Sequence, residues 1–285
     1  MIWVDGRIVA DDDLKVSVLD RTLEHGLGLF ETFRTWNGRA PLLDRHLARL
    51  ERSAKELGVS LASVRLPDQD AVETLVDREG IGRDVALRIT LTGGRDALNG
   101  STLFMRVRPL PNEVRHGGAI VDVGTWQVPM FDPLIRHKSL NYWTRRRVYE
   151  SAQSMGFDES LSTLDLEEFL MPLEGSRTNL FIVTGEILTT PPLVFPIVPG
   201  IMRGLVIELA LELGNKVIED TKVIDKKFEG ATEVFLTNSV RGIIPVNKII
   251  RAYPFQSFSW PAPGPVTQRL MILASDWLQS RGGKS

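Results

Sequence analysis

Lys138 and Glu174 are the titratable residues of this chain with the clearest potential for chemistry. Lys138 lies in the segment IRHKSLNYW, after an apolar stretch and before a predicted helix that opens near Ser139. A lysine amine becomes reactive when burial and neighbouring positive charge let it lose its proton near neutral pH. Glu174, in LEGSRTN, precedes a predicted strand. Each residue also has an ordinary explanation, since a solvated lysine and a turn carboxylate are common at such places.

An anion site is the second candidate. A Pro199-Gly200 turn precedes a predicted helix over 201–213, so the backbone amides of Ile201 and Met202 open that helix. Helix starts favour anions because their first amides lack partners and the helix dipole is positive there. Arg49 projects from the first long predicted helix, where its guanidinium could either bind an anion or lie on the surface.

Alternating and helical patterns predict an N-terminal α/β arrangement. Residues 2–9 read as two short strands around a turn at Asp5-Gly6, and residues 30–36 alternate and end at the hairpin signal Asn37-Gly38. Apolar residues then recur at helical spacing from 42 to 57. A second helix near 68–79 and strands over 84–92 and 102–107 follow.

The segment RPLPNEVRHGG, residues 108–118, is the predicted boundary between two domains. Proline and glycine at both ends, with polar residues between them, are typical of a linker. The sequence therefore predicts a smaller N-terminal α/β domain over 1–112, a linker over 113–118 and a larger C-terminal domain over 119–285. The fold class expected for the whole chain is α/β (α+β).

Composition excludes several kinds of site. The chain has 285 residues, 43% of them hydrophobic and 25% charged, which is typical of a globular protein. It has no cysteine, so thiol catalysis, iron–sulfur clusters and zinc–cysteine sites are excluded. The 4 histidines lack helical ligand spacing, and we expect no metal centre.

Charge and hydropathy argue against nucleic-acid and membrane partners. The formal net charge is -2, and a solvated helix face explains the basic triplet 145–147 better than a phosphate-binding patch does. The most apolar stretch, residues 187–202, is interrupted by prolines and shorter than the roughly 20 residues of a membrane span. The N-terminal residues lack a signal pattern, so we expect a cytoplasmic protein.

Six segments, in this order, resemble the class IV aminotransferases, which are the pyridoxal-phosphate enzymes of fold type IV. The segments are HGLGLFETFRTWNG, DRHLARLERSA, HKSLNY, EGSRTNLF, PGIMRG and FLTNSVRGIIPV. The resemblance covers residues from about 2 to 250. It implies a mixed β-barrel-like core in the C-terminal domain, pyridoxal 5'-phosphate as the cofactor, and a homodimer with active sites near the subunit interface.

The resemblance also implies a role for each matching residue. Lys138 would form the Schiff base with the cofactor and then move a proton between the substrate α-carbon and the cofactor. Glu174 would hold the pyridine nitrogen protonated, so that the ring accepts electrons from the substrate. Tyr142 would contact the phenolic oxygen of the cofactor. The phosphate would be bound by Arg49, by the amides of Ile201 and Met202, and by Ser239.

Three positions depart from the family pattern. Met202 stands where many relatives have threonine, so only its amide can bind the phosphate. Arg241 stands where relatives often carry small or polar residues near the substrate. Typical bacillary D-amino acid aminotransferases bind the substrate carboxylate with an Arg-x-His pair, and here Arg95 stands alone in the equivalent loop.

The lysine segment indicates the substrate. HKSLN resembles D-amino acid aminotransferases, whereas branched-chain enzymes usually have a glycine-rich stretch after the lysine. Period-two alternation places Arg34 on the face of Phe30, so both would line the substrate site. Arg34 and Arg95 would hold the substrate carboxylate, unless Arg34 pairs with a neighbouring carboxylate. Arg241 and Arg177 are the next candidates for that contact.

We therefore predict a D-amino acid transaminase that works by a ping-pong mechanism with a 2-oxo acid and also accepts some (R)-amines. An aminodeoxychorismate lyase, which releases pyruvate and 4-aminobenzoate, and a branched-chain L-amino acid aminotransferase remain alternatives. A non-catalytic protein on the same fold is a further alternative. The presence of Lys138, Glu174 and Arg49 together argues against this alternative, because a non-catalytic protein would need none of them.

Overall fold

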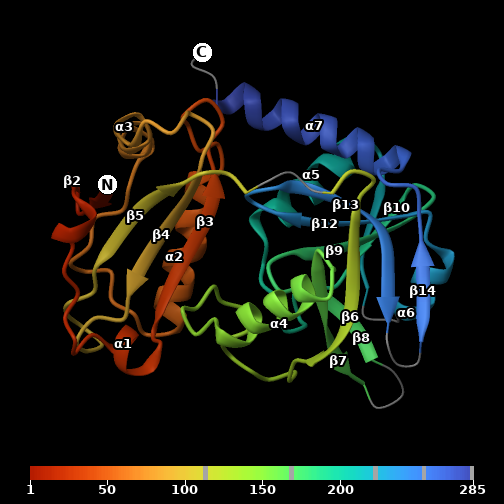
Figure 1. The fold of residues 1–285 in the computed structure, drawn as a ribbon, viewed down its shortest axis with the longest axis horizontal. Helices are drawn as coiled ribbons and strands as arrows, with labels where there is room; N and C mark the ends of the chain where they lie inside the picture. Colours follow the sequence, from red (N-terminus) through yellow and green to blue (C-terminus); the bar gives the residue numbers. More distant parts are fainter. Residues whose placement is uncertain (112–114, 167–169, 221–223, 252–254, 283–285) are drawn as a thin grey trace. The chain divides into compact units, whose positions relative to one another are not determined.

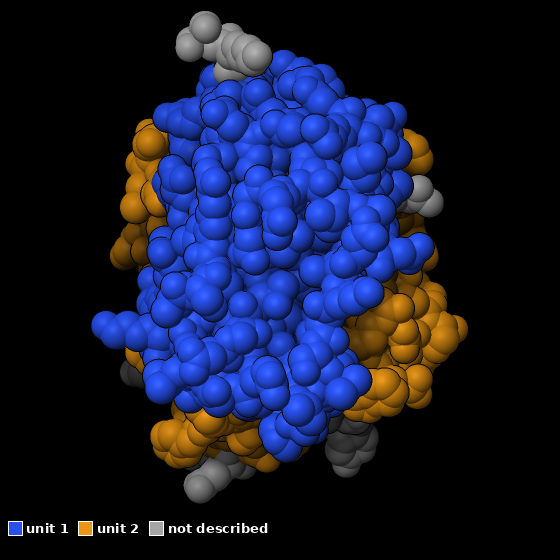
Figure 2. Space-filling model, turned by 90° about the vertical axis from the view of Figure 1, so that its left-hand side faces the viewer, with its two compact units in different colours: residues 1–111, 137–141, 276–285 blue, residues 112–136, 142–275 orange. Residues whose placement is uncertain are grey.

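The computed structural model describes residues 1–111, 115–166, 170–220, 224–251 and 255–282. These residues form two compact units, each with its own hydrophobic core. Unit 1 comprises residues 1–111, 137–141 and 276–285, and unit 2 comprises residues 112–136 and 142–275 (Figure 2). Residues 113 and 114 of the predicted linker lie outside the described residues.

Unit 1 is built on an antiparallel sheet with the strand order β2-β1-β5-β4-β3 (Figure 1). The predicted turns at Asp5-Gly6 and Asn37-Gly38 are present, and all four residues have the positive φ that such turns require. The strands are β1 (Ile2–Val4), β2 (Arg7–Val9), β3 (Gly28–Arg34), β4 (Ala86–Thr92) and β5 (Leu103–Arg108).

The helices of unit 1 follow the predicted periodicity. α2 (Leu43–Glu56) packs against β3, and α3 (Gln69–Glu79) packs near β1 and β5; a short α1 (Arg21–His25) precedes β3. The buried face of α2 is only partly apolar, since it comprises Leu43, His46, Arg49, Leu50, Ser53 and Ala54. A surface position for Arg49 is therefore ruled out.

Unit 2 is a mixed sheet that closes on itself. The path β9-β12-β13-β6-β7-β8 returns to β9, with β10 and β11 continuing from β9 on one side and β14 pairing with β13. The pairs β6–β13 and β6–β7 are parallel. The strands are β6 (Ala119–Gln127), β7 (Glu159–Asp165), β8 (Leu170–Gly175), β9 (Asn179–Thr184), β10 (Ile187–Thr190), β11 (Lys216–Glu219), β12 (Glu233–Asn238), β13 (Gly242–Arg251) and β14 (Gln256–Ser259). The predicted α/β class with a barrel-like core is confirmed.

Helices flank this sheet. α4 (Trp143–Ser154) packs on β7, α5 (Ile201–Glu212) packs on β11 and β12, and α6 (Ile224–Gly230) contacts β8 and β9. α7 (Pro265–Gly282) ends the described chain. Among the described residues, no helix is both long and apolar enough to cross a membrane.

The predicted helix opening near Ser139 is wrong, because α4 begins only at Trp143. Residues 137–141 pair with β3 instead. Leu29 and Ser139 form an antiparallel bridge, Phe30 N donates to Lys138 O at 2.9 Å, and Leu140 N donates to Gly28 O at 2.9 Å. This pairing makes the lysine segment part of unit 1.

Candidate active site

A row of polar residues crosses three strands of unit 2. Glu174 near the end of β8 is opposite Asn179 on β9, and Asn179 is opposite Thr237 on β12. Directly opposed residues project from the same face of a sheet, so the three side chains lie side by side. All three are buried, and Thr237 Oγ1 has no hydrogen-bond partner among the described residues.

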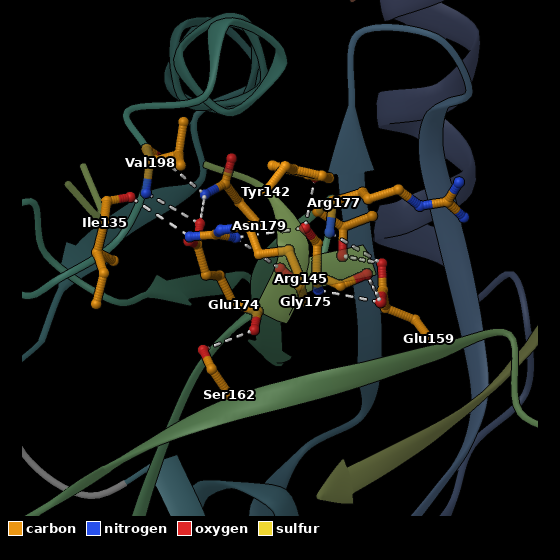
Figure 3. A network of polar contacts seen from close by, with 12 residues as sticks. Ile135, Tyr142, Arg145, Glu159, Ser162, Glu174, Gly175, Arg177, Asn179 and Val198 are labelled. Carbon is orange, nitrogen blue, oxygen red and sulfur yellow. Dashed lines mark hydrogen bonds and ion pairs between the residues drawn. The ribbon is translucent and has the colours of Figure 1, made fainter. Parts of the chain in front are cut away.

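The Glu174 carboxylate is buried, and both of its oxygens accept hydrogen bonds from the protein (Figure 3). Oε1 accepts from Arg145 Nη2 at 2.6 Å. Oε2 accepts from Asn179 Nδ2 and from the backbone amide of Val198, each at 3.1 Å. Such bonds compensate the desolvation of a charge that is only 2% exposed.

A second buried carboxylate, Glu159 at the start of β7, organises the turn between β8 and β9. Its oxygens accept from the amide and hydroxyl of Ser176 at 3.0 and 2.6 Å, and from the amide of Arg177 and the hydroxyl of Thr178 at 3.3 Å each (Figure 3). Glu159 therefore fixes the backbone that carries Glu174 and Asn179. Nothing in its sequence context distinguishes it from an ordinary strand carboxylate.

Tyr142 and Arg145 approach this turn from α4. The Tyr142 hydroxyl donates to Ser176 O at 2.9 Å, and burial raises the pKa of Tyr142. To donate to a cofactor oxygen, this hydroxyl must first leave Ser176. The predicted solvated face at 145–147 is wrong for Arg145, whose side chain is 13% exposed, and correct for Arg146 and Arg147, at 62% and 64%.

The start of α5 offers amide donors in the same unit. Its N-cap, Gly200, supplies no side-chain cap to the first amides, and a Cβ at Gly200 would lie only 1.9 Å from Asn179 Oδ1. Asn179 also donates to Val198 O at 3.0 Å, so it connects the Glu174 carboxylate to the loop before α5. This close approach places Ile201 and Met202 at one end of the Glu174 network.

The turn between β12 and β13 reaches the same helix start. Asn238 Oδ1 accepts from the amides of Val240 and Arg241 at 3.0 and 2.8 Å, which folds residues 238–241 tightly. A Cβ at Gly242 would lie 4.0 Å from Met202 Cε. The end of this turn, which contains Ser239, therefore lies near the Met202 side chain.

In unit 1, two backbone hydrogen bonds pair residues 138–140 with β3. Close approach requires glycine at position 28, since a Cβ there would lie 2.9 Å from the backbone oxygen of Leu91. His137 Nδ1 lies 2.9 Å from the hydroxyl of Ser53 on α2. The lysine is thus fixed between strand and helix, which its sequence spacing alone did not indicate.

The Lys138 amine lies 4.6 Å from the centre of the Phe30 ring. The guanidinium of Arg88, on β4, lies 3.8 Å from the centre of the same ring. An aromatic face attracts cations, so Phe30 brings the amine and the guanidinium into one neighbourhood. Arg88 was not among the predicted site residues, although it is opposite Thr32, two residues along β3 from Phe30.

Arg49 belongs to a buried cluster with Glu31 of β3 and His46 of α2. Its Nε donates to Glu31 Oε1 at 2.8 Å, and Nη2 bonds to Oε2. His46 Nδ1 lies 2.7 Å from Glu31 Oε2, while His46 Nε2 is buried without a hydrogen-bond partner among the described residues. Since a carboxylate only accepts, the Nδ1 atom carries the proton of a neutral ring.

The electrostatics of this cluster follow from its burial. Burial alone would raise the pKa of Glu31, but the charge and hydrogen bonds of Arg49, with a further bond from His46, lower it to about 2. Burial lowers the pKa of His46, the bond to Glu31 opposes this, and the charges of Arg49 and Lys138 lower it further. The cluster thus comprises one carboxylate, one guanidinium and one neutral imidazole.

The other predicted substrate contacts are placed differently. Arg34 Nη2 pairs with Asp84 at 3.4 Å and stacks 4.1 Å over the Trp36 ring, which is the alternative that the sequence left open. Arg34 is four residues along β3 from Phe30, or roughly 13 Å at strand rise. Arg95 is exposed in the loop between β4 and β5.

Arg241 and Arg177 are the next candidates for the carboxylate contact. Arg241 ends the turn of unit 2 that contains Ser239. Arg177 is exposed and stacks 3.4 Å over the Tyr149 ring.

Comparisons with known proteins agree with this fold and these segments. The family model described as amino-transferase class IV matches residues 28–249. A putative branched-chain-amino-acid aminotransferase of Methanocaldococcus jannaschii is 34% identical over 259 residues, covering 87% of each chain. A D-alanine aminotransferase of Bacillus licheniformis is 27% identical over 294 residues, covering 100% of this chain and 99% of the relative.

Among solved structures, a branched-chain aminotransferase from Thermoproteus uzoniensis with norvaline superposes with a TM-score of 0.81 at 26% identity. The match covers 98% of this chain and 95% of that one. The chain belongs to the class IV aminotransferases. The family prediction is confirmed.

Class IV aminotransferases use pyridoxal phosphate, and the residues present suit that group. In unit 2, a buried anionic carboxylate, an uncapped helix start and the orphaned hydroxyl of Thr237 offer one acceptor and several donors. In unit 1, a lysine amine lies near a buried guanidinium and a neutral imidazole whose Nε2 has no partner among the described residues. A cofactor with a ring nitrogen, an aldehyde and a phosphate matches these chemical types.

Substitution Glu31→Gln tests the buried pair in unit 1. Because the pKa of Glu31 falls from 4.5 to about 2 on folding, its ionisation contributes roughly 3 kcal/mol to stability above pH 4.5. The contribution of a group with a lowered folded pKa disappears as the pH falls from about 4.5 towards 2. We expect the variant to be less stable than wild type at pH 7, and the difference in free energy of unfolding to shrink in that window.

Urea unfolding at a series of pH values measures this difference. Glu51→Gln, at an exposed position on the same helix α2, is the matched control and should change stability by less than about 0.5 kcal/mol. A difference for Glu31→Gln that stays constant from pH 7 to pH 2 would contradict the assignment.

Proposed function

We propose that this aminotransferase acts on hydrophobic L-amino acids of the branched-chain type and on a 2-oxo acid, with pyridoxal phosphate as its cofactor and a ping-pong mechanism. The similarity to the Methanocaldococcus jannaschii protein carries this proposal, at 34% identity over 259 residues. The Thermoproteus structure, solved with the apolar amino acid norvaline, supports it. A homodimer remains part of the proposal.

The D-amino acid prediction has lost its physical support in unit 1. It rested on the likeness of the lysine segment HKSLN to D-amino acid aminotransferases and on Arg34 and Arg95 as a double anchor for the substrate carboxylate. Of these two arginines, Arg34 pairs with Asp84 and Arg95 is exposed. Arg88 is the better candidate, because it shares the Phe30 ring with the Lys138 amine. A guanidinium there could bind the carboxylate of either hand.

A D-amino acid substrate remains the second candidate, on the similarity to the Bacillus licheniformis D-alanine aminotransferase over the full chain. Tolerance of (R)-amines would accompany that activity. An aminodeoxychorismate lyase remains the third candidate.

The proposed cofactor contacts are those predicted from the sequence, now with defined surroundings. Lys138 would bind the cofactor covalently through its amine and move the proton at the substrate α-carbon. Glu174 would hold a proton at the ring nitrogen. The bound cofactor supplies an electron-accepting ring for the substrate α-carbon. The phosphate would be held by the amides of Ile201 and Met202, by Ser239 and by Arg49.

Arg49 has a restricted geometry for that last role. Glu31 binds its Nε and Nη2 atoms, so a bound phosphate would share this guanidinium with the Glu31 carboxylate. Tyr142 is proposed to orient the β8–β9 turn through Ser176 O, and to contact the cofactor only after its hydroxyl rotates.

Borohydride reduction of the purified holoenzyme should fix the cofactor on Lys138, because this amine is held by β3 and Phe30. Peptide mapping by mass spectrometry locates the modified lysine. Lys138→Ala, reconstituted and reduced in the same way, is the control and should carry no modification. Modification of Lys248 or of any other lysine in the wild-type protein would refute the assignment.

The substrate proposal predicts faster conversion of L-leucine than of L-alanine or D-alanine. Each methylene bound in an apolar pocket changes specificity by roughly ten- to two-hundred-fold, so L-leucine should lead L-alanine at least tenfold. Stopped-flow absorbance of the cofactor during the half-reaction measures these rates. Faster reaction of D-alanine would select the second candidate instead.

Substitution Arg88→Ala tests the carboxylate contact. A charge-assisted hydrogen bond contributes roughly 1.5–3 kcal/mol, so KM for L-leucine should rise about ten- to a hundredfold. Arg34→Ala should change KM by less than about twofold, since that arginine is paired with Asp84. A larger effect from Arg34→Ala than from Arg88→Ala would restore the original sequence prediction.

A further inference from the structure

Arg145 makes the most extensive set of contacts around Glu174. Its Nη2 bonds to Glu174 Oε1 at 2.6 Å and donates to Ile135 O at 3.4 Å. Its Nη1 donates to the carbonyl oxygens of Gly175 and Ser176 at 3.5 and 3.4 Å (Figure 3). The guanidinium also lies 5.4 Å from the centre of the Trp126 ring. The side chain is thus held by one carboxylate, three backbone carbonyls and one aromatic ring.

Burying the Arg145 guanidinium costs free energy, so a buried charge here is expected to have a function. Removing an ion from water costs several kcal/mol, and an attractive partner only partly repays it. Neutral donors already serve Glu174 Oε2, through Asn179 Nδ2 and the amide of Val198 at 3.1 Å each. A neutral donor could also have served Oε1, so the special property of Arg145 is its positive charge.

The Arg145 guanidinium stays protonated. Burial would lower the pKa of Arg145, but Glu174, with smaller contributions from Tyr142 and Glu159, raises it above its ordinary value. Of the other charged groups near this network, Glu159 is engaged by the β8–β9 turn, and Arg177 stacks on Tyr149. Arg145 thus provides a cation in direct contact with Glu174.

We propose that Arg145 is a positioning residue that keeps Glu174 charged, so that the proton shared between Glu174 and the cofactor stays on the ring nitrogen. This inference rests on the proposed function, in which Glu174 faces that nitrogen. Arg145 acts only through Glu174 and takes no part in binding the substrate.

The physical reason is the competition between two bases for one proton. In a buried site, a neutral acid beside a neutral ring is favoured over a carboxylate beside a cationic ring, because separated charges are poorly solvated there. A guanidinium on the carboxylate reverses this preference by making the carboxylate the weaker base. An opposite charge at such a distance shifts a carboxyl equilibrium by roughly ten- to a thousand-fold.

The test uses holoenzyme reconstituted with pyridoxal phosphate that carries 15N at the ring nitrogen, whose chemical shift reports protonation directly. In wild type, the signal should be that of a protonated ring. In Arg145→Gln, it should move towards the neutral ring, and the half-reaction should slow at least about tenfold. Arg145→Lys, which keeps the charge, should restore most of the wild-type shift.

Two further variants calibrate the measurement. Glu174→Gln should give the neutral-ring signal, and Arg146→Gln, an exposed neighbour paired with Glu150, should match wild type. Circular dichroism and thermal melting identify any variant that fails to fold. If Arg145→Gln does not fold, the 15N shifts of Arg145→Lys and Arg145→Met are compared instead. Only the lysine variant keeps the charge, so only Arg145→Met should move towards the neutral-ring signal.

An Arg145→Gln signal identical to wild type, while Glu174→Gln shows the neutral ring, would overturn the inference and leave the proposed function standing. An unchanged signal in Glu174→Gln itself would mean that Glu174 does not protonate the ring, and the proposed role of Glu174 would fail. If Arg145 only stabilised the fold, replacing it would lower the stability of the protein without moving the 15N shift.

Discussion

Buried carboxylates are the feature on which the rest of the structure depends. Glu174, Glu159 and Glu31 are each at most 3% exposed, so each must be compensated by donors or by positive charge. The compensation differs in each case. Glu159 is satisfied by a turn of neutral donors, while Glu174 and Glu31 each bind a guanidinium. The surrounding backbone is arranged around these partners.

In unit 2, this requirement links elements that are far apart in sequence. Arg145 comes from α4, Asn179 from β9 and the Val198 amide from the loop before α5. A helix start that could bind phosphate is therefore attached to the carboxylate proposed for the ring nitrogen. One hydrogen-bond network would thus position both ends of the proposed cofactor site.

Local patterns in the sequence were sufficient for the family and for most elements of unit 1, but not for the start of α4 or for the buried ion pairs. The α2 periodicity predicted that helix correctly, and it also contained the signal that Arg49 is buried, since His46 and Arg49 fall on the same face as Leu43 and Leu50. Six motif segments were enough to identify the family.

Long-range pairing explains what was missed. The segment 137–141 looked like a helix start, because its bridge to Leu29 involves a strand more than a hundred residues earlier. Arg145 looked like one member of a solvated triplet, and only its approach to Glu174 sets it apart. The partner of Arg34 is Asp84, fifty residues further along the chain. A single sequence carries no record of such contacts.

A crystal structure of the holoenzyme would test the central claim, that Glu174 is a buried ion serving the ring nitrogen, most directly. We expect the ring nitrogen within hydrogen-bond distance of a Glu174 oxygen, about 2.7–3.2 Å, with Arg145 still on the same carboxylate. A ring nitrogen that contacts another side chain, or a Glu174 carboxylate turned away from the cofactor, would contradict the account.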